Sequence, residues 1–142
     1  MSKRHTDAFI MAGDVVYYDE LARSVPLAYY HWQRTYSLPT LIDFHRHAPT
    51  FFLKDDHDTY FDDSWPGQRR AWSEDFTFED GQRIFLQQTG LPSPAYRTFQ
   101  VGKDLQVWLM EGRDYRSPND APDGADKSIW GAEQKAWIKQ TL

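Results

Sequence analysis

Two acidic clusters contain the residues of this sequence best suited to chemistry. The first spans residues 13–19 and includes Asp14, and the second, residues 55–63, contains five aspartates and one histidine. Carboxylates at this density repel one another unless a positive charge compensates them. A bound cation is the simplest compensation. Oxygen and imidazole ligands without sulfur suit Mg, Ca, Mn, Fe or Zn, and the chain has no cysteine.

A solvated acidic loop is the alternative for either cluster alone. We favour a metal site because each cluster follows a short apolar run, and because His57 is flanked by carboxylates. A carboxylate beside a histidine is the usual arrangement that orients an imidazole ring. Arg113 and Arg116 are candidates for holding a phosphate through paired donors, or for pairing with nearby acidic residues.

The elements that position these clusters form an α/β pattern. Apolar runs predict buried strands at 8–12 and 50–54, and the first is typical of a parallel strand covered on both faces. Because ligands bind at the carboxyl ends of parallel strands, we expect Asp14 and the Asp56-His57 pair to converge. Helical spacing, with the positions of proline and glycine, predicts helices from Pro26 to about 35, from Pro39 to before Pro49, at 78–88 and at 129–142. Alternation of apolar and polar residues predicts a hairpin with strands at 96–101 and 105–110.

Composition excludes several classes of protein. The 142 residues suit one domain or a piece of a larger one, and the net charge of −5 argues against a nucleic-acid partner. No apolar run approaches the ~20 residues of a membrane span, so no membrane partner is expected. The segment from Met1 to Asp7 does not read as a signal peptide, and the sequence leaves the localisation open.

Four motifs occur in an order that resembles a known family. They are Gly13-Asp14-x-x-Tyr17, Asp55-Asp56-His57-Asp58, the stretch Glu111-Gly112-Arg113-Asp114-Tyr115-Arg116, and Trp130-Gly131-Ala132-Glu133-Gln134-x-x-Trp137. Together they resemble the PhoD-like alkaline phosphatases of the calcineurin-like metallophosphoesterase superfamily, from about Asp7 to the last residue. The resemblance implies a β-sandwich flanked by helices, two divalent or trivalent metal ions of the Fe, Ca, Mn or Zn class, and hydrolysis of small-molecule phosphate esters.

The resemblance also implies roles for individual residues. Asp14 would bridge the two metals, while Tyr17 and Asp56 would add metal ligands. Asp62, or its neighbour Asp63, lies near a further ligand position. The catalytic residues would be His57, which would contact the phosphate or protonate the leaving group, and Asp58, which would orient His57.

The chain also departs from the family pattern. The resemblance implies that residues 1–142 are the central part of a PhoD-like domain that lacks the first and last metal-ligand segments, and the isolated chain is therefore expected to have little or no phosphatase activity. Glu111 stands where many relatives have aspartate. Two alternatives stay open: an inactive remnant that serves as a structural or binding piece, and a hydrolase of other esters, such as sulfates, on the same scaffold.

Overall fold

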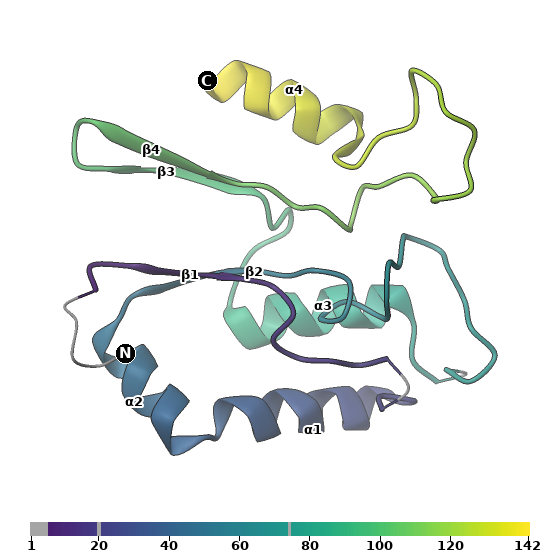
Figure 1. Cartoon of the computed structure of the whole chain (residues 1–142), viewed down its shortest axis with the longest axis horizontal. Helices are drawn as coiled ribbons and strands as arrows, with labels where there is room; N and C mark the ends of the chain where they lie inside the picture. The colour runs from purple at the N-terminus through teal and green to yellow at the C-terminus, as the bar shows by residue number, and fades with distance from the viewer. Residues whose placement is uncertain (1–5, 20, 74) are drawn as a thin grey trace.

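The computed structural model is mixed α/β, as the order of the predicted elements indicated, and describes residues 6–19, 21–73 and 75–142. The segment Met1–His5, on which part of the signal-peptide argument rests, lies outside these residues. Within the described ranges there are four helices and two two-stranded sheets: β1 (Phe9–Ala12), α1 (Val25–Tyr36), α2 (Pro39–His47), β2 (Thr50–Leu53), α3 (Phe78–Thr89), β3 (Arg97–Val101), β4 (Leu105–Leu109) and α4 (Gly131–Thr141) (Figure 1).

Strands β1 and β2 pair in parallel, and the two helices α1 and α2 connect them. The register pairs Phe9 with Thr50 and Ala12 with Leu53, so both strands end at the same edge. The prediction that β1 is covered on both faces is wrong, because alternate residues are exposed and Ile10 is 44% accessible. One face is covered by α2, where Phe44 packs edge-on against Phe9.

An aromatic core lies between α1, α3 and the segments that follow β1 and β2. Trp32 of α1 and Phe85 of α3 pack together, and Tyr18 and Tyr60 are fully buried beside them. Burial of large aromatic side chains supplies much of the apolar contact in a chain of this size. Because Tyr18 lies within the first acidic cluster and Tyr60 within the second, the core also holds the backbone of both clusters in place.

The antiparallel hairpin β3–β4 and helix α4 lie on the other side of the β1–β2 pair (Figure 1). The ring of Phe99 on β3 stacks on Phe51 of β2, with centroids 4.2 Å apart. The side chain of Gln134 attaches α4: its amide accepts from the N–H of Glu111 at 2.8 Å and donates to the carbonyl of Glu111 at 2.8 Å. Among the described residues, no helix has the length and apolar character that crossing a membrane requires.

Candidate functional site

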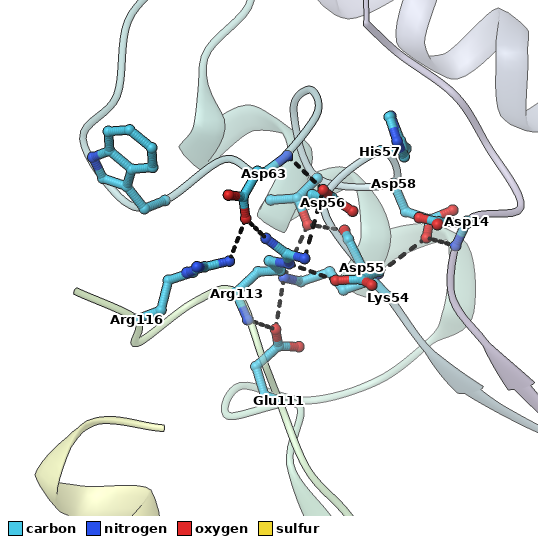
Figure 2. A network of polar contacts seen from close by, with 12 residues as sticks. Asp14, Lys54, Asp55, Asp56, His57, Asp58, Asp63, Glu111, Arg113 and Arg116 are labelled. Atoms are coloured by element: carbon cyan, nitrogen blue, oxygen red, sulfur yellow. Dashed lines mark hydrogen bonds and ion pairs between the residues drawn. The ribbon is translucent and has the colours of Figure 1, made fainter. Parts of the chain in front are cut away.

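The two acidic clusters meet where β1 and β2 end, as the parallel pairing predicts. Asp14, Asp56 and His57 each offer one ligand atom, and these atoms all lie within 4.8 Å of one another. Figure 2 shows the three side chains around the ends of the two strands. The predicted convergence of Asp14 with the Asp56-His57 pair is therefore confirmed.

The carboxylate of Asp58 binds the backbone of the turn after β1. It accepts hydrogen bonds from the N–H groups of Asp14 at 2.5 Å, Val15 at 2.8 Å and Val16 at 2.8 Å, and from Asp55 at 3.1 Å. Asp58 is 2% exposed, and Asp14 has a positive φ of 55° within this turn. Four convergent N–H donors are a strong site for one carboxylate, so Asp58 fixes the position of Asp14.

Gly13 is required where the first cluster begins. Its φ is +102°, a conformation that side-chain-bearing residues rarely adopt. A Cβ at this position would lie 2.7 Å from the backbone nitrogen of Asp55. The absence of a side chain thus lets the two strand ends approach closely enough for the clusters to meet.

The ring of His57 is held by Asp19, not by Asp58. Its Nδ1 lies 2.8 Å and 2.9 Å from the two carboxylate oxygens of Asp19, and Tyr17 stacks on its face with ring centroids 4.3 Å apart. Burial lowers the pKa of His57, but the hydrogen bond and charge of Asp19 outweigh it and leave the pKa raised. The expected role of Asp58 as the orienting acid is therefore corrected.

Sequence reasoning did not assign a role to Asp19, although it lies in the first cluster. The available signal was its position five residues after Asp14 in an acidic segment. The pairing itself joins residues 38 positions apart. No local pattern indicates which of several aspartates makes such a contact.

Asp14 and Asp56 are the two carboxylates of the group of three. Asp56 is 6% exposed, and its Oδ2 accepts from the backbone N–H of Asp63 at 2.5 Å. The pKa of Asp14 is raised by partial burial and then by the charges of Asp56 and Asp55. The side chain of Asp14 has no hydrogen bond or ion pair with the residues that the structure describes. Two carboxylate oxygens suit one hard or borderline cation, and the ring of His57 lies beside them.

Two other predicted metal ligands lie beside this group. Asp62 is outside it: one carboxylate oxygen is 3.9 Å from His57 Nε2, and the side chain is 83% exposed. Tyr17 presents its ring face to His57, and the charge of Asp14 raises the pKa of its phenol. A raised phenol pKa favours the neutral form, which is a poorer ligand than a phenolate.

Arg113 and Arg116 pair with the second acidic cluster, one of the two alternatives predicted for them. Arg113 lies among three carboxylates, with contacts of 2.5 Å to Asp55, 3.0 Å to Asp63 and 3.5 Å to Asp56 (Figure 2). Arg116 contacts Asp63 at 2.8 Å. These ion pairs neutralise the side of the cluster that faces the third motif.

Lys54 forms a buried ion-pair network behind the acidic clusters. Its ammonium lies 3.0 Å from Glu111 and 2.5 Å from Asp114, and it donates to Thr59 at 3.1 Å. Burial lowers the pKa of Lys54, but the charges of the two carboxylates leave it raised. Glu111 also accepts from the backbone N–H of Arg113 at 2.8 Å. Glu111 is therefore a structural residue that shapes the loop carrying Arg113.

The chain matches no protein-family model, and searches of curated proteins and of solved structures likewise give no match.

Proposed function

We propose that the chain is part of a metal-dependent phosphoric ester hydrolase of the PhoD-like type. The observation that supports this most is the convergence of Asp14, Asp56 and His57 at the ends of two parallel strands. The order of the four sequence motifs is the second support. In this proposal the two small sheets belong to a metallophosphoesterase sandwich, and the substrate is a small-molecule phosphate ester.

In this proposal the carboxylates at the strand ends bind the metal. Asp14 and Asp56 would hold a cation, which when bound activates a water molecule and neutralises charge on the phosphoryl oxygens. The described residues contain one such group of ligands, and Asp14 is the residue that a second ion would share. Tyr17 and Asp62 are nearby but would have to turn toward the ion to bind it.

His57 would act on the leaving group. With Nδ1–H donated to Asp19, the other ring nitrogen, Nε2, is the one left to hold or release a proton. The raised pKa of His57 keeps the ring protonated to higher pH. A protonated Nε2 can donate to the oxygen that departs from phosphorus.

Metal binding and turnover test the proposal together. Isothermal titration with Mn²⁺ and Zn²⁺ should detect an ion in the wild-type chain, and Asp14→Asn should weaken its binding at least about 10-fold. Asp43→Asn, which removes an exposed carboxylate from α2, is the matched control and should not change binding. The same samples are assayed with aryl phosphate monoesters and diesters and with an aryl sulfate.

Binding tests the metal site, and turnover tests what the isolated chain can catalyse. Metal-dependent phosphate turnover that Asp14→Asn abolishes supports the hydrolase and overturns the expectation that the isolated chain is inactive. Faster turnover of the sulfate selects the hydrolase of other esters. A bound ion without turnover is the result expected both of a partial catalytic domain and of an inactive remnant, so it supports the metal site alone. If the wild-type chain binds neither ion more tightly than Asp14→Asn does, the metal site and the function built on it are wrong.

A further inference from the structure

A pocket borders the ring of His57. It has a volume of about 340 Å³, at the lower end of the range for small-molecule sites, and it is lined by Asp19, Leu21, Phe61, Asp62, Arg70 and Trp72. Two of the lining residues contact the ring: Asp19 lies 2.8 Å from Nδ1, and Asp62 lies 3.9 Å from Nε2. The pocket therefore lies next to the residue that is proposed to act on the leaving group.

Apolar side chains contribute to the lining of this pocket. The rings of Phe61 and Trp72 have centroids 6.1 Å apart and an interplanar angle of 59°, and the side chain of Leu21 is 56% exposed. Aromatic and aliphatic groups in a pocket bind the apolar body of a small molecule. This part of the lining suits the carbon skeleton of an alcohol.

Arg70 brings a positive charge that has no acidic partner among the residues that the structure describes. Its guanidinium carbon lies 3.8 Å from the centroid of the Phe61 ring, a cation–π contact that favours this position. Within the same described residues, the guanidinium makes no hydrogen bond and no ion pair. Arg70 is exposed, so a ligand can reach its N–H donors.

The two carboxylates of the lining limit the charge of such a ligand. Asp19 is paired with His57, and Asp62 is 83% exposed and therefore hydrated. Because both carry a carboxylate beside the pocket, they would repel a dianion such as a second phosphate more than a single carboxylate. A guanidinium and a carboxylate also match in shape and can form two parallel hydrogen bonds.

We propose that this pocket binds the leaving group of the substrate and selects phosphate esters whose alcohol carries a carboxylate. The inference rests on the proposed hydrolase function, which gives His57 a leaving group to act on. The apolar body of the alcohol would lie against Trp72 and Leu21, and its carboxylate would pair with Arg70. Arg70 would thus determine specificity and take no part in the chemical step.

The alcohol alone tests the pocket, without metal and without turnover. The probe 4-hydroxybenzoate carries a carboxylate at neutral pH, and 4-hydroxybenzamide has nearly the same shape without the charge. Both are titrated into the metal-free whole chain at low salt, and amide NMR spectra report where they bind. We expect 4-hydroxybenzoate to shift the signals of Leu21, Asp62 and Trp72. It should bind at least about 5-fold more tightly than the amide, the effect of one partly exposed charged hydrogen bond.

Two arginine variants separate a contact in the pocket from the general charge of the chain. Arg70→Gln should weaken 4-hydroxybenzoate at least about 5-fold and leave 4-hydroxybenzamide unchanged. Arg69→Gln is the matched control, because it removes the same charge from the adjacent residue, which pairs with Glu79 at 3.0 Å and does not line the pocket. It should change the binding of neither probe.

Several results would overturn the proposal. They are equal binding of the two probes, equal effects of the two arginine variants, signal changes away from the lining residues, and no change at millimolar 4-hydroxybenzoate. The metal titration with Asp14→Asn keeps the two proposals apart. If an ion is bound and the benzoate is not preferred, the specificity of the pocket is wrong and the hydrolase stands. If no ion is bound and the benzoate is preferred, the hydrolase is wrong, and the leaving-group role of the pocket is overturned with it.

Discussion

Replacing Asp58 by asparagine tests whether this residue stabilises the turn after β1 or instead orients the ring of His57. Asp58→Asn keeps the size and shape of the side chain but replaces one carboxylate oxygen by an NH2 group. In the structure each of the two oxygens accepts from two backbone N–H groups. The asparagine oxygen can keep one such pair, while the NH2 group must face the other pair as a donor against two donors.

The size of the effect follows from these contacts. A hydrogen bond to a charged acceptor contributes about 1.5–3 kcal/mol, so loss of one pair should cost about 3–6 kcal/mol. Asp58 is 2% exposed, and solvent cannot replace the lost bonds. Since small domains have about 5–15 kcal/mol of stability in total, Asp58→Asn should leave the fold marginal. An acid whose only task was to orient His57 would have little effect on stability.

Urea denaturation at neutral pH, monitored by tryptophan fluorescence, measures how much Asp58→Asn lowers the free energy of unfolding. The matched variant is Asp19→Asn, which removes the charge that holds His57 from a side chain that is 32% exposed. We expect Asp19→Asn to change the free energy of unfolding by less than about 1 kcal/mol. The reasoning fails if Asp58→Asn costs less than about 1 kcal/mol, or if both variants cost the same.

Two further predictions concern helix α3. In Gly81→Ala the new Cβ would lie 1.6 Å from the carbonyl oxygen of Thr59, and we expect urea denaturation to show a loss of more than about 3 kcal/mol. Gly112→Ala meets no atom within 4 Å and should cost less than about 1 kcal/mol; equal losses would contradict the close approach. Burial raises the pKa of Asp80, but hydrogen bonds from Arg83 and the helix cap leave it lowered from 3.8. Asp80→Asn should therefore cost about 1 kcal/mol at neutral pH, and the gap should close as the pH falls below 3.8, because a lowered pKa contributes stability only while the carboxyl is ionised. A gap that is unchanged at low pH would contradict this assignment.

Local signals were sufficient for most of the elements. Pro39 is the first residue of α2, as predicted from its fixed φ, and Gly90 ends α3 with a positive φ of 68°. The predicted strands and helices differ from the observed ones by one or two residues at their ends. The exposed face of β1 was not predictable from the run of apolar residues alone, because exposure depends on what packs against a strand and not on its own composition.

The partners of the site residues were harder to predict than the site itself. The parallel pairing of two strands is enough to bring Asp14 close to His57, so convergence follows from topology. Which carboxylate contacts the ring depends on where each side chain points. Asp58 is adjacent to His57 in sequence, yet it faces the turn after β1, while Asp19 reaches His57 from the other cluster.

The structure also changes the charge argument for a cation. In the sequence, all five aspartates of the second cluster required compensation. In the structure Arg113 and Arg116 pair with Asp55 and Asp63, and backbone N–H groups surround Asp58. Asp62, the fourth, is 83% exposed and can be hydrated.

The carboxylate that the chain compensates least is that of Asp14. It is exposed to solvent and has no hydrogen bond or ion pair among the described residues, whereas Asp56 accepts from a backbone N–H and forms an ion pair with Arg113 at 3.5 Å. The carboxylates of Asp14 and Asp56 lie beside the ring of His57, the residue proposed to act on the leaving group. The argument for a cation thus becomes narrower than the sequence suggested, because it depends on two carboxylates instead of five. It also becomes more specific, because the single substitution Asp14→Asn should be enough to weaken binding of the ion.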